Sequence, residues 1–177
     1  MLAGESYFAE DAELLADRRA CRVLTERLAA IGVADLPTRA DVLASLFGAI
    51  GEETEVLSPF QCDYGYQIRL GARTFINYGA VILDSASVVI GDDVQIGPNV
   101  QLLTPLHPLD PTERRTRYER AEPVHIGDGA WLAAGVIVCP GVTVGADAVV
   151  GAGSVVTRDL PGRHLCVGSP CRAVREL

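Results

Sequence analysis

VHIGDG, AWLAAG, VIVCPG, VTVGAD, AVVGAG and SVVTRD follow one another without a break over residues 124–159, and the third residue of each unit is aliphatic. These anchor residues are Ile126, Leu132, Val138, Val144, Val150 and Val156. An apolar period of six matches neither the helical period of about 3.6 nor the strand period of about two. Because Gly, Asp or Pro follows most anchors, the chain is expected to turn at regular intervals. The run therefore predicts the short strands and turns of a β-solenoid.

The same period extends toward the N-terminus. Residues 88–105 contain VVIGDD, VQIGPN and VQLLTP, whose anchors are Ile90, Ile96 and Leu102. Earlier anchors with the same spacing, before a slip of two residues at Asp84–Ser85, are Leu70, Ile76 and Ile82. Three such units close one triangular coil of about 18 residues, whose backbone pairs with the coils above and below. We therefore expect a mainly β chain, built as a parallel β-helix of hexapeptide repeats.

The N-terminal part of the chain lacks this period. Its apolar residues recur at helical spacings, at Leu14, Cys21, Leu24, Leu28 and Ile31. Asp11 is expected to cap this first helix and Pro37 to end it. A shorter helix follows, with Thr38 expected as its N-cap. We divide the chain into an N-terminal helical cap, residues 1–58, and a β-helix domain, residues 59–177.

One segment interrupts the repeat. Residues 104–123, TPLHPLDPTERRTRYERAEP, are too polar and too rich in proline to form a coil. We expect a loop over residues 103–123 that is ejected from the solenoid, and loops on rigid scaffolds often carry functional sites. The charged run from Glu113 to Arg120 is expected to form a solvated face or a contact with a neighbouring subunit.

The distribution of charge indicates which classes of ligand the chain can bind. A formal net charge of −8 disfavours a nucleic-acid surface, which needs a basic patch to release phosphate counterions. The C-terminal segment is locally basic, with Asp159 as its one acid up to Arg175 and four arginines, Arg158, Arg163, Arg172 and Arg175. This segment is either an anion site for a small polyphosphate or a solvated charged tail.

The remaining composition predicts the compartment. No stretch approaches the roughly 20 apolar residues that a bilayer requires, so we expect no membrane partner. The start MLAGESYFAEDAELL does not resemble a signal peptide. Five cysteines without a CxxC pair suit reduced thiols, mostly as small buried side chains. We therefore expect a cytoplasmic protein.

Histidine is the candidate for acid–base chemistry. Of the three histidines, His125 is expected to point outward beside the anchor Ile126, and His164 has no recognisable partner in the sequence. His107 begins the ejected loop, where a strand of the solenoid holds its backbone and the loop can cover it. On the residues alone, His107 is either a general base or a polar residue that shapes the corner before Pro108.

Several motifs together resemble the maltose and galactoside O-acetyltransferases. They are the HPLDP loop, CDYGY at residues 62–66, VILD at 81–84, VTVGADAVVGAGSVVTRDLP, and the ending GSPCRAVREL, and the start MLAGESY is similar to the helical cap of that family. The resemblance implies a left-handed β-helix, a homotrimer, and sites for acetyl-CoA and a sugar acceptor between subunits. It also implies that His107 removes the proton from the attacking sugar hydroxyl, with no metal.

The resemblance implies the remaining site residues as well. For the acceptor they are Asn77, Asp63, Asp84 and Ser85, and for acetyl-CoA they are Trp131, Ala134, Ala152, Thr157, Arg158, Arg172 and Arg175. Arg158 stands where the family commonly has lysine, and Asp63 and Ser85 differ from the galactoside branch. CDYGY favours a maltose-like or glucose-like acceptor. The alternative role of Trp131 is an outward aromatic residue that covers a coil.

Three alternatives remain open on the sequence. The acceptor can be another hydroxyl, such as that of an antibiotic or a lipo-oligosaccharide. The chain can be a non-enzymatic trimeric scaffold, although His107, Asn77 and the C-terminal arginines together argue against it. A zinc hydratase that resembles the gamma-type carbonic anhydrases is disfavoured, because that class needs three histidine ligands and its HxxxxH pair is absent here.

Overall fold

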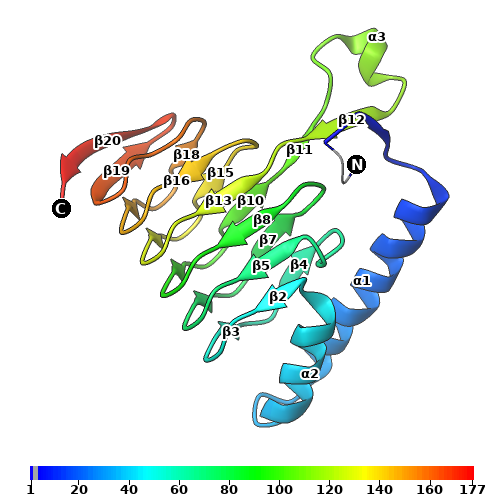
Figure 1. The fold of residues 1–177 in the computed structure, drawn as a ribbon, viewed down its shortest axis with the longest axis horizontal. Helices are drawn as coiled ribbons and strands as arrows, with labels where there is room; N and C mark the ends of the chain where they lie inside the picture. The colour runs from blue at the N-terminus through cyan, green and yellow to red at the C-terminus, as the bar shows by residue number, and fades with distance from the viewer. Residues whose placement is uncertain (2–3) are drawn as a thin grey trace.

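A computed structural model describes residue 1 and residues 4–177, so Leu2 and Ala3 of the MLAGESY segment lie outside the described residues. Short parallel strands stack into a three-sided solenoid, with two helices beside its N-terminal coils and one loop projecting from its side (Figure 1). The expected mainly β, parallel β-helix architecture is confirmed.

Each side of the solenoid is one sheet, named here faces 1, 2 and 3. Face 1 contains β4 (Phe60–Cys62), β7 (Ala80–Leu83), β10 (Gln101–Leu103), β15 (Ile137–Val138) and β18 (Val155–Val156). Face 2 contains β2 (Ala49–Ile50), β5 (Ile68–Leu70), β8 (Val88–Ile90), β13 (Val124–Ile126) and β16 (Thr143–Val144). Face 3 contains β3 (Glu55–Val56), β6 (Phe75–Ile76), β9 (Gln95–Ile96), β14 (Trp131–Leu132), β17 (Val149–Val150), β19 (His164–Gly168) and β20 (Cys171–Glu176).

The sequence period sets the register between coils. On face 2, Leu70 pairs with Ile90, Ile90 with Ile126, and Ile126 with Val144. Anchors therefore stack on anchors inside the solenoid, where all twelve predicted anchors are buried. Their outward neighbours, such as His125, stay exposed as expected. Backbone pairing and apolar burial thus reinforce each other in every coil.

The helical cap packs against the first coils. α1 (Ala12–Ala30) and α2 (Leu36–Leu46) bury Cys21, Leu28 and Leu46 against the core. Asp11 caps α1 as predicted, by accepting the Glu13 N–H. The predicted cap of the second helix is wrong: Asp35 is the N-cap and accepts the Thr38 N–H, because Pro37 is suited to the first turn of a helix.

The ejected loop has structure of its own. Its arms are β11 (Pro105–Leu106) and β12 (Tyr118–Ala121), and α3 (Pro111–Arg114) lies at its tip. A strand from the N-terminal segment, β1 (Tyr7–Phe8), pairs antiparallel with β12, so the sheet order is β1-β12-β11. The first strand of the chain therefore lies beside the loop and not at the helical end of the solenoid (Figure 1).

Two corners of the solenoid carry the predicted site residues. The loop corner, between faces 1 and 2, comprises residues 63–67, 84–87, 104–123, 139–142 and 157–159. The Asn77 corner, between faces 3 and 1, comprises residues 57–59, 77–79, 97–100, 133–136 and 151–154. The slip in the sequence period at Asp84–Ser85 lies in the loop corner, where the turn between β7 and β8 is extended.

Candidate active site

His107 is fixed at the base of the projecting loop. It directly follows β11, whose residue Leu106 pairs with Arg120 of β12. Thr104, fully buried, holds the exit point: its hydroxyl donates to the Leu83 carbonyl at 2.6 Å and accepts the Ala86 N–H at 3.0 Å. The histidine is thus mounted on the solenoid, while 60% of its side chain remains exposed.

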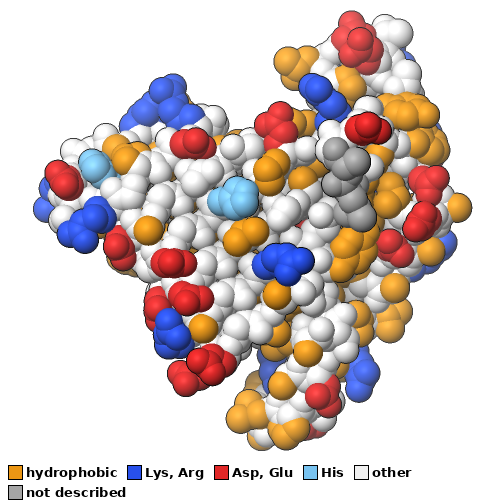
Figure 2. Space-filling view, in the orientation of Figure 1, with side chains coloured by type: hydrophobic (Ala, Val, Ile, Leu, Met, Phe, Trp, Pro, Cys, Tyr) orange, Lys and Arg blue, Asp and Glu red, His pale blue; other side chains and the backbone are white. Residues whose placement is uncertain are grey.

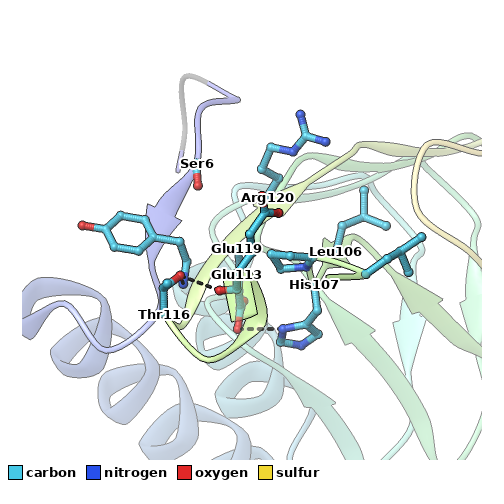
Figure 3. Close-up of a pocket in the computed structure, with 10 residues that line it drawn as sticks. Ser6, Leu106, His107, Glu113, Thr116, Glu119 and Arg120 are labelled. Atoms are coloured by element: carbon cyan, nitrogen blue, oxygen red, sulfur yellow. Dashed lines mark hydrogen bonds and ion pairs between the residues drawn. The ribbon is translucent and has the colours of Figure 1, made fainter. Parts of the chain in front are cut away.

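A cavity of about 600 Å³ opens beside His107. Its walls come from the N-terminal segment and from both arms of the loop, and include Ser6, Leu106, Glu113, Glu119 and Arg120 (Figure 3). At the tip, Asp110 caps α3, and Arg114 donates to the carbonyls of Pro108 and Leu109. These bonds hold the backbone that follows His107.

His107 faces a carboxylate that sequence reasoning did not single out. Its Nδ1 atom lies 3.4 Å from Oε1 of Glu119, whose side chain is only 17% exposed. The other oxygen of Glu119 accepts a hydrogen bond of 3.1 Å from the Tyr7 hydroxyl. Burial raises the pKa of Tyr7 to about 12, against a smaller lowering by the Ser85 hydroxyl, so Tyr7 keeps its proton near neutrality. Figure 3 shows the His107–Glu119 contact.

Asp84, one of the residues predicted for the acceptor, is buried in the loop corner. It is fully buried, and its carboxylate accepts the backbone N–H groups of Asp63, Tyr64 and Gln67 at 3.1, 2.8 and 3.4 Å. Burial raises the pKa of Asp84 to about 6, although these donors favour its ionised form. These hydrogen bonds tie Asp84 to the turn that follows β4. Ser85, 4% exposed, lies beneath the site beside Tyr7.

Asp63 is the more accessible acid of this corner. It lines a cavity of about 290 Å³ together with Arg22 and Glu26 of α1 and with Gln61. Burial raises the pKa of Asp63, nearby Arg18 lowers it and Glu119 raises it. Asp63 therefore lies within electrostatic range of Glu119.

A second group of predicted residues meets at the Asn77 corner. Asn77, Trp131 and Ala134 line a shallow cavity of about 230 Å³ together with Gln95 and Pro98. Trp131 points outward from face 3 and is 51% exposed, so a flat ligand can pack against its ring. Asn77 is held by accepting the Tyr78 N–H at 2.7 Å. The structure thus brings Asn77 next to the residues predicted for the cofactor.

The other predicted cofactor residues lie toward the C-terminal end. Ala152 is exposed in the Asn77 corner, and Thr157 and Arg158 are exposed in the loop corner. Arg172 and Arg175 belong to β20, in the terminal hairpin with β19. Arg172 donates to its neighbouring carbonyl of Cys171, and Arg175 is exposed. Figure 2 shows basic side chains over this hairpin, where an anionic ligand can approach.

One chain does not bring all the predicted residues together. His107 and Asp63 lie at the loop corner, whereas Asn77 lies at the Asn77 corner with Trp131 beside it on face 3, and face 1 separates the two corners. The sequence also left Glu119 and Tyr7 unassigned. Their only sequence signals were membership of a charged run and of the segment MLAGESY, because their proximity depends on pairing between distant strands.

Within residue 1 and residues 4–177, no group of three or more His, Cys, Asp or Glu side chains is arranged to hold a metal ion. Over the same residues, no helix has the length and apolar character needed to cross a membrane.

Comparisons with known proteins agree with this geometry. Residues 1–51 match the maltose acetyltransferase hexapeptide capping motif, and residues 123–158 match the bacterial transferase hexapeptide (six repeats). The chain is 44% identical to nodulation protein L of Rhizobium meliloti (strain 1021), over 97% of this chain and 94% of that protein.

Solved structures of acetyltransferases also resemble this chain. A maltose O-acetyltransferase from Clostridium difficile 630 superposes with a TM-score of 0.97 at 41% identity, covering 99% of this chain and 94% of the other. A galactoside acetyltransferase in complex with coenzyme A superposes with a TM-score of 0.94 at 32% identity, covering 98% of this chain and 87% of the other.

Proposed function

Because the chain belongs to the maltose and galactoside O-acetyltransferase family of left-handed, hexapeptide-repeat acyltransferases, we propose that it transfers an acetyl group from acetyl-CoA to a sugar hydroxyl, with His107 as the general base. The observation that carries this proposal is the placement of His107. The imidazole is exposed beside a cavity, and its Nδ1 side faces Glu119.

This arrangement leaves the other ring nitrogen, Nε2, available for the acceptor. The base takes the proton of the sugar hydroxyl as the hydroxyl oxygen attacks the thioester carbonyl. A tetrahedral oxyanion forms, which backbone N–H groups can stabilise. Its collapse breaks the C–S bond, and the departing CoA thiolate takes the proton from the imidazolium ion, so that CoA leaves as the thiol and the base is regenerated. No step uses a cysteine, consistent with the burial of Cys21, Cys166 and Cys171.

The two corners then share the substrates. In the proposal, Asp63 and Asn77 contact the sugar, and Ser85 supports the acceptor side from beneath. The pantetheine and phosphates of acetyl-CoA lie along Trp131, Ala134, Ala152, Thr157, Arg158, Arg172 and Arg175. The basic hairpin supports this direction, since charge-assisted hydrogen bonds to phosphate are among the strong ones. A maltose-like or glucose-like acceptor remains our proposal for the sugar.

A homotrimer completes the site in this proposal. His107 and Asn77 lie at different corners of one chain, so the loop corner of one subunit must meet the Asn77 corner of the next. Face 1 between them offers outward apolar side chains that are only half-buried in the single chain, Val81, Leu83, Ile137 and Val155. Light scattering that shows a monomer at micromolar concentration would remove the shared site.

The test is an acetyl-transfer assay that follows free thiol release from acetyl-CoA. The panel contains maltose, glucose, a galactoside and a hydroxyl-bearing antibiotic. We expect sugar-dependent thiol release, which His107→Ala lowers by about 100-fold to 10,000-fold. Because an imidazolium ion has no free lone pair, parental activity should also fall as the medium becomes acidic.

Two controls separate base catalysis from a structural role. His125→Ala removes a histidine from the outside of face 2 and should leave activity unchanged. His107→Gln keeps polarity and bulk but offers no comparable base. A Gln variant that turns over sugar at close to the parental rate would overturn the general-base assignment, and thiol release with the antibiotic alone would replace the sugar as acceptor.

A further inference from the structure

Three strands from separate parts of the chain meet at His107. His107 directly follows β11, β12 carries Glu119, and β1 carries Tyr7. The register places Tyr7 directly opposite Glu119, so their side chains project from the same side of the small sheet. A contact between the N-terminal segment and the loop is therefore built into strand pairing.

The polar groups of these strands form a chain of contacts. The Tyr7 hydroxyl donates to Oε2 of Glu119 at 3.1 Å, and Oε1 of the same carboxylate lies 3.4 Å from Nδ1 of His107. Tyr7 is 7% exposed and the Glu119 side chain 17%, whereas the His107 side chain is 60% exposed. The three side chains therefore lead from the protein interior, at Tyr7, to the cavity, at His107, which is the proposed base.

We infer that Glu119 is a positioning residue for His107 and that Tyr7 holds Glu119 in place. This inference rests on the proposed function. A carboxylate at Nδ1 holds the proton on that nitrogen, leaves the lone pair on Nε2 and stabilises the imidazolium ion formed when the base accepts a proton. The buried tyrosine restricts the carboxylate to the orientation in which one oxygen points at the histidine.

The charged groups around Glu119 favour its pairing with Tyr7 and His107. Asp63 from the end of β4 repels Glu119, and Glu113 and Arg120 line the same cavity. A partly buried carboxylate near another acid needs favourable partners: the Tyr7 hydroxyl donates a hydrogen bond to Glu119, and Nδ1 of His107 lies within ion-pair distance of its other oxygen. The N-terminal strand is therefore part of the catalytic apparatus and does more than cap the solenoid.

The test compares three variants in the intact protein, with kcat and KM measured separately. Glu119→Gln removes the charge and keeps the size. We expect its kcat to fall by about 10-fold to 1,000-fold, with little change in the KM for acetyl-CoA, and the acidic limb of the kcat profile to move to lower pH. Tyr7→Phe removes one hydroxyl and should lower kcat by a smaller factor, about 3-fold to 10-fold.

The matched control is Glu10→Gln. Glu10 also joins the N-terminal segment to the loop, through Arg117, but it does not contact His107. We expect this variant to retain the parental kcat, and thermal unfolding should show that Glu119→Gln and Glu10→Gln fold equally well. A normal kcat and an unmoved pH profile in folded Glu119→Gln would overturn the inference.

A double variant distinguishes failure of the inference from failure of the proposed function. If Glu119 acts through His107, then adding Glu119→Gln to His107→Ala should cause no further loss of activity. Additive losses would show that Glu119 acts independently and would overturn the positioning role. Normal activity in His107→Ala alone would overturn the proposed function itself, and the positioning role with it.

Discussion

The coils after the loop have a regular repeat, whereas the loop corner does not. In residues 124–156, each six-residue unit repeats the same buried anchor and outward neighbour, so neighbouring coils supply nearly identical environments. The loop corner repeats little: it contains the extended turns, the buried polar groups Asp84 and Thr104, and the three-stranded sheet around His107. The regular coils provide rigidity, and the irregular corner provides the proposed chemistry.

The largest expected effect comes from deleting the loop, which should separate folding of the coils from acetyl transfer. Its ends meet, since the Glu122 N–H donates to the Thr104 carbonyl at 2.9 Å. Replacing residues 105–121 with two glycines should leave the stacked coils folded and abolish acetyl transfer, by more than about 1,000-fold, because the base is lost. Circular dichroism and the thiol-release assay check the two expectations. A variant that fails to fold would show that the corner also stabilises the coils.

A core substitution should have the opposite effect. Ile126→Ala removes a buried anchor that stacks between Ile90 and Val144 and should lower the free energy of unfolding by about 2–5 kcal/mol. Its neighbour His125 is exposed on the same strand, and His125→Ala should change that free energy by less than about 0.5 kcal/mol. Urea unfolding at one protein concentration measures both. Similar values would contradict the assignment of inward and outward positions.

Asp84 makes the loop corner sensitive to pH in a way the regular coils are not. Its pKa is raised from 3.8 to about 6 in the folded chain, so the folded state binds this proton more tightly than the unfolded state does. Its contribution to stability is therefore greatest below about pH 4 and is lost as pH rises through about 6. The difference amounts to at most about 3 kcal/mol.

The variant Asp84→Asn isolates this contribution. It removes the ionisation and keeps an oxygen that can accept the Tyr64 N–H. Compared with the parent, it should lose less stability between pH 4.5 and 7.5, measured by urea unfolding at each pH. Parallel curves for parent and variant would mean that Asp84 titrates alike in the folded and unfolded states.

Substitutions in the hairpin of β19 and β20 test the proposed CoA site at the C-terminal end of the regular coils. Arg172→Ala with Arg175→Ala should weaken CoA binding by about 10-fold to 100-fold, less than two buried charge-assisted hydrogen bonds would give, because Arg175 is exposed. Calorimetry measures the affinity, and circular dichroism checks the fold. Unchanged affinity would return these arginines to the role of a solvated charged tail.

The smallest expected effect concerns the turns between coils. Gly153 has a φ of +70° and open space around an added Cβ, so Gly153→Ala should cost about 1–2 kcal/mol from backbone strain alone. An added Cβ at Gly127 would lie 2.6 Å from the Ala146 nitrogen of the next coil. Gly127→Ala should therefore destabilise the protein more than Gly153→Ala in thermal unfolding, and the reverse order would contradict the tight spacing between coils.

The sequence predicts the regular coils better than the loop corner, because local interactions set the coils. The period of six identified the anchors from Leu70 to Val156, because in a solenoid each residue's environment is set by its place in a short local unit. It missed the first coil, where Ile50, Val56 and Cys62 pair with Leu70, Ile76 and Ile82. The slip at Asp84–Ser85 was visible in the sequence, but it did not reveal that the Asp84 carboxylate is buried on three backbone donors. The helix cap at Asp35 was missed because Thr38 offered a competing capping pattern.

The sequence by itself determined the parallel β-helix, the helical cap and the ejection of the loop, since periodicity and turn residues are local, and its motifs made His107 the proposed base. Only the tertiary structure decided that Tyr7 and Glu119 meet beside His107, and that His107 and Asn77 lie at separate corners. Strand pairing joins Tyr7 to Glu119, which lie 112 positions apart in the chain, and coil stacking sets the separation of His107 and Asn77. The spacing of residues along the chain cannot encode which distant strands become neighbours.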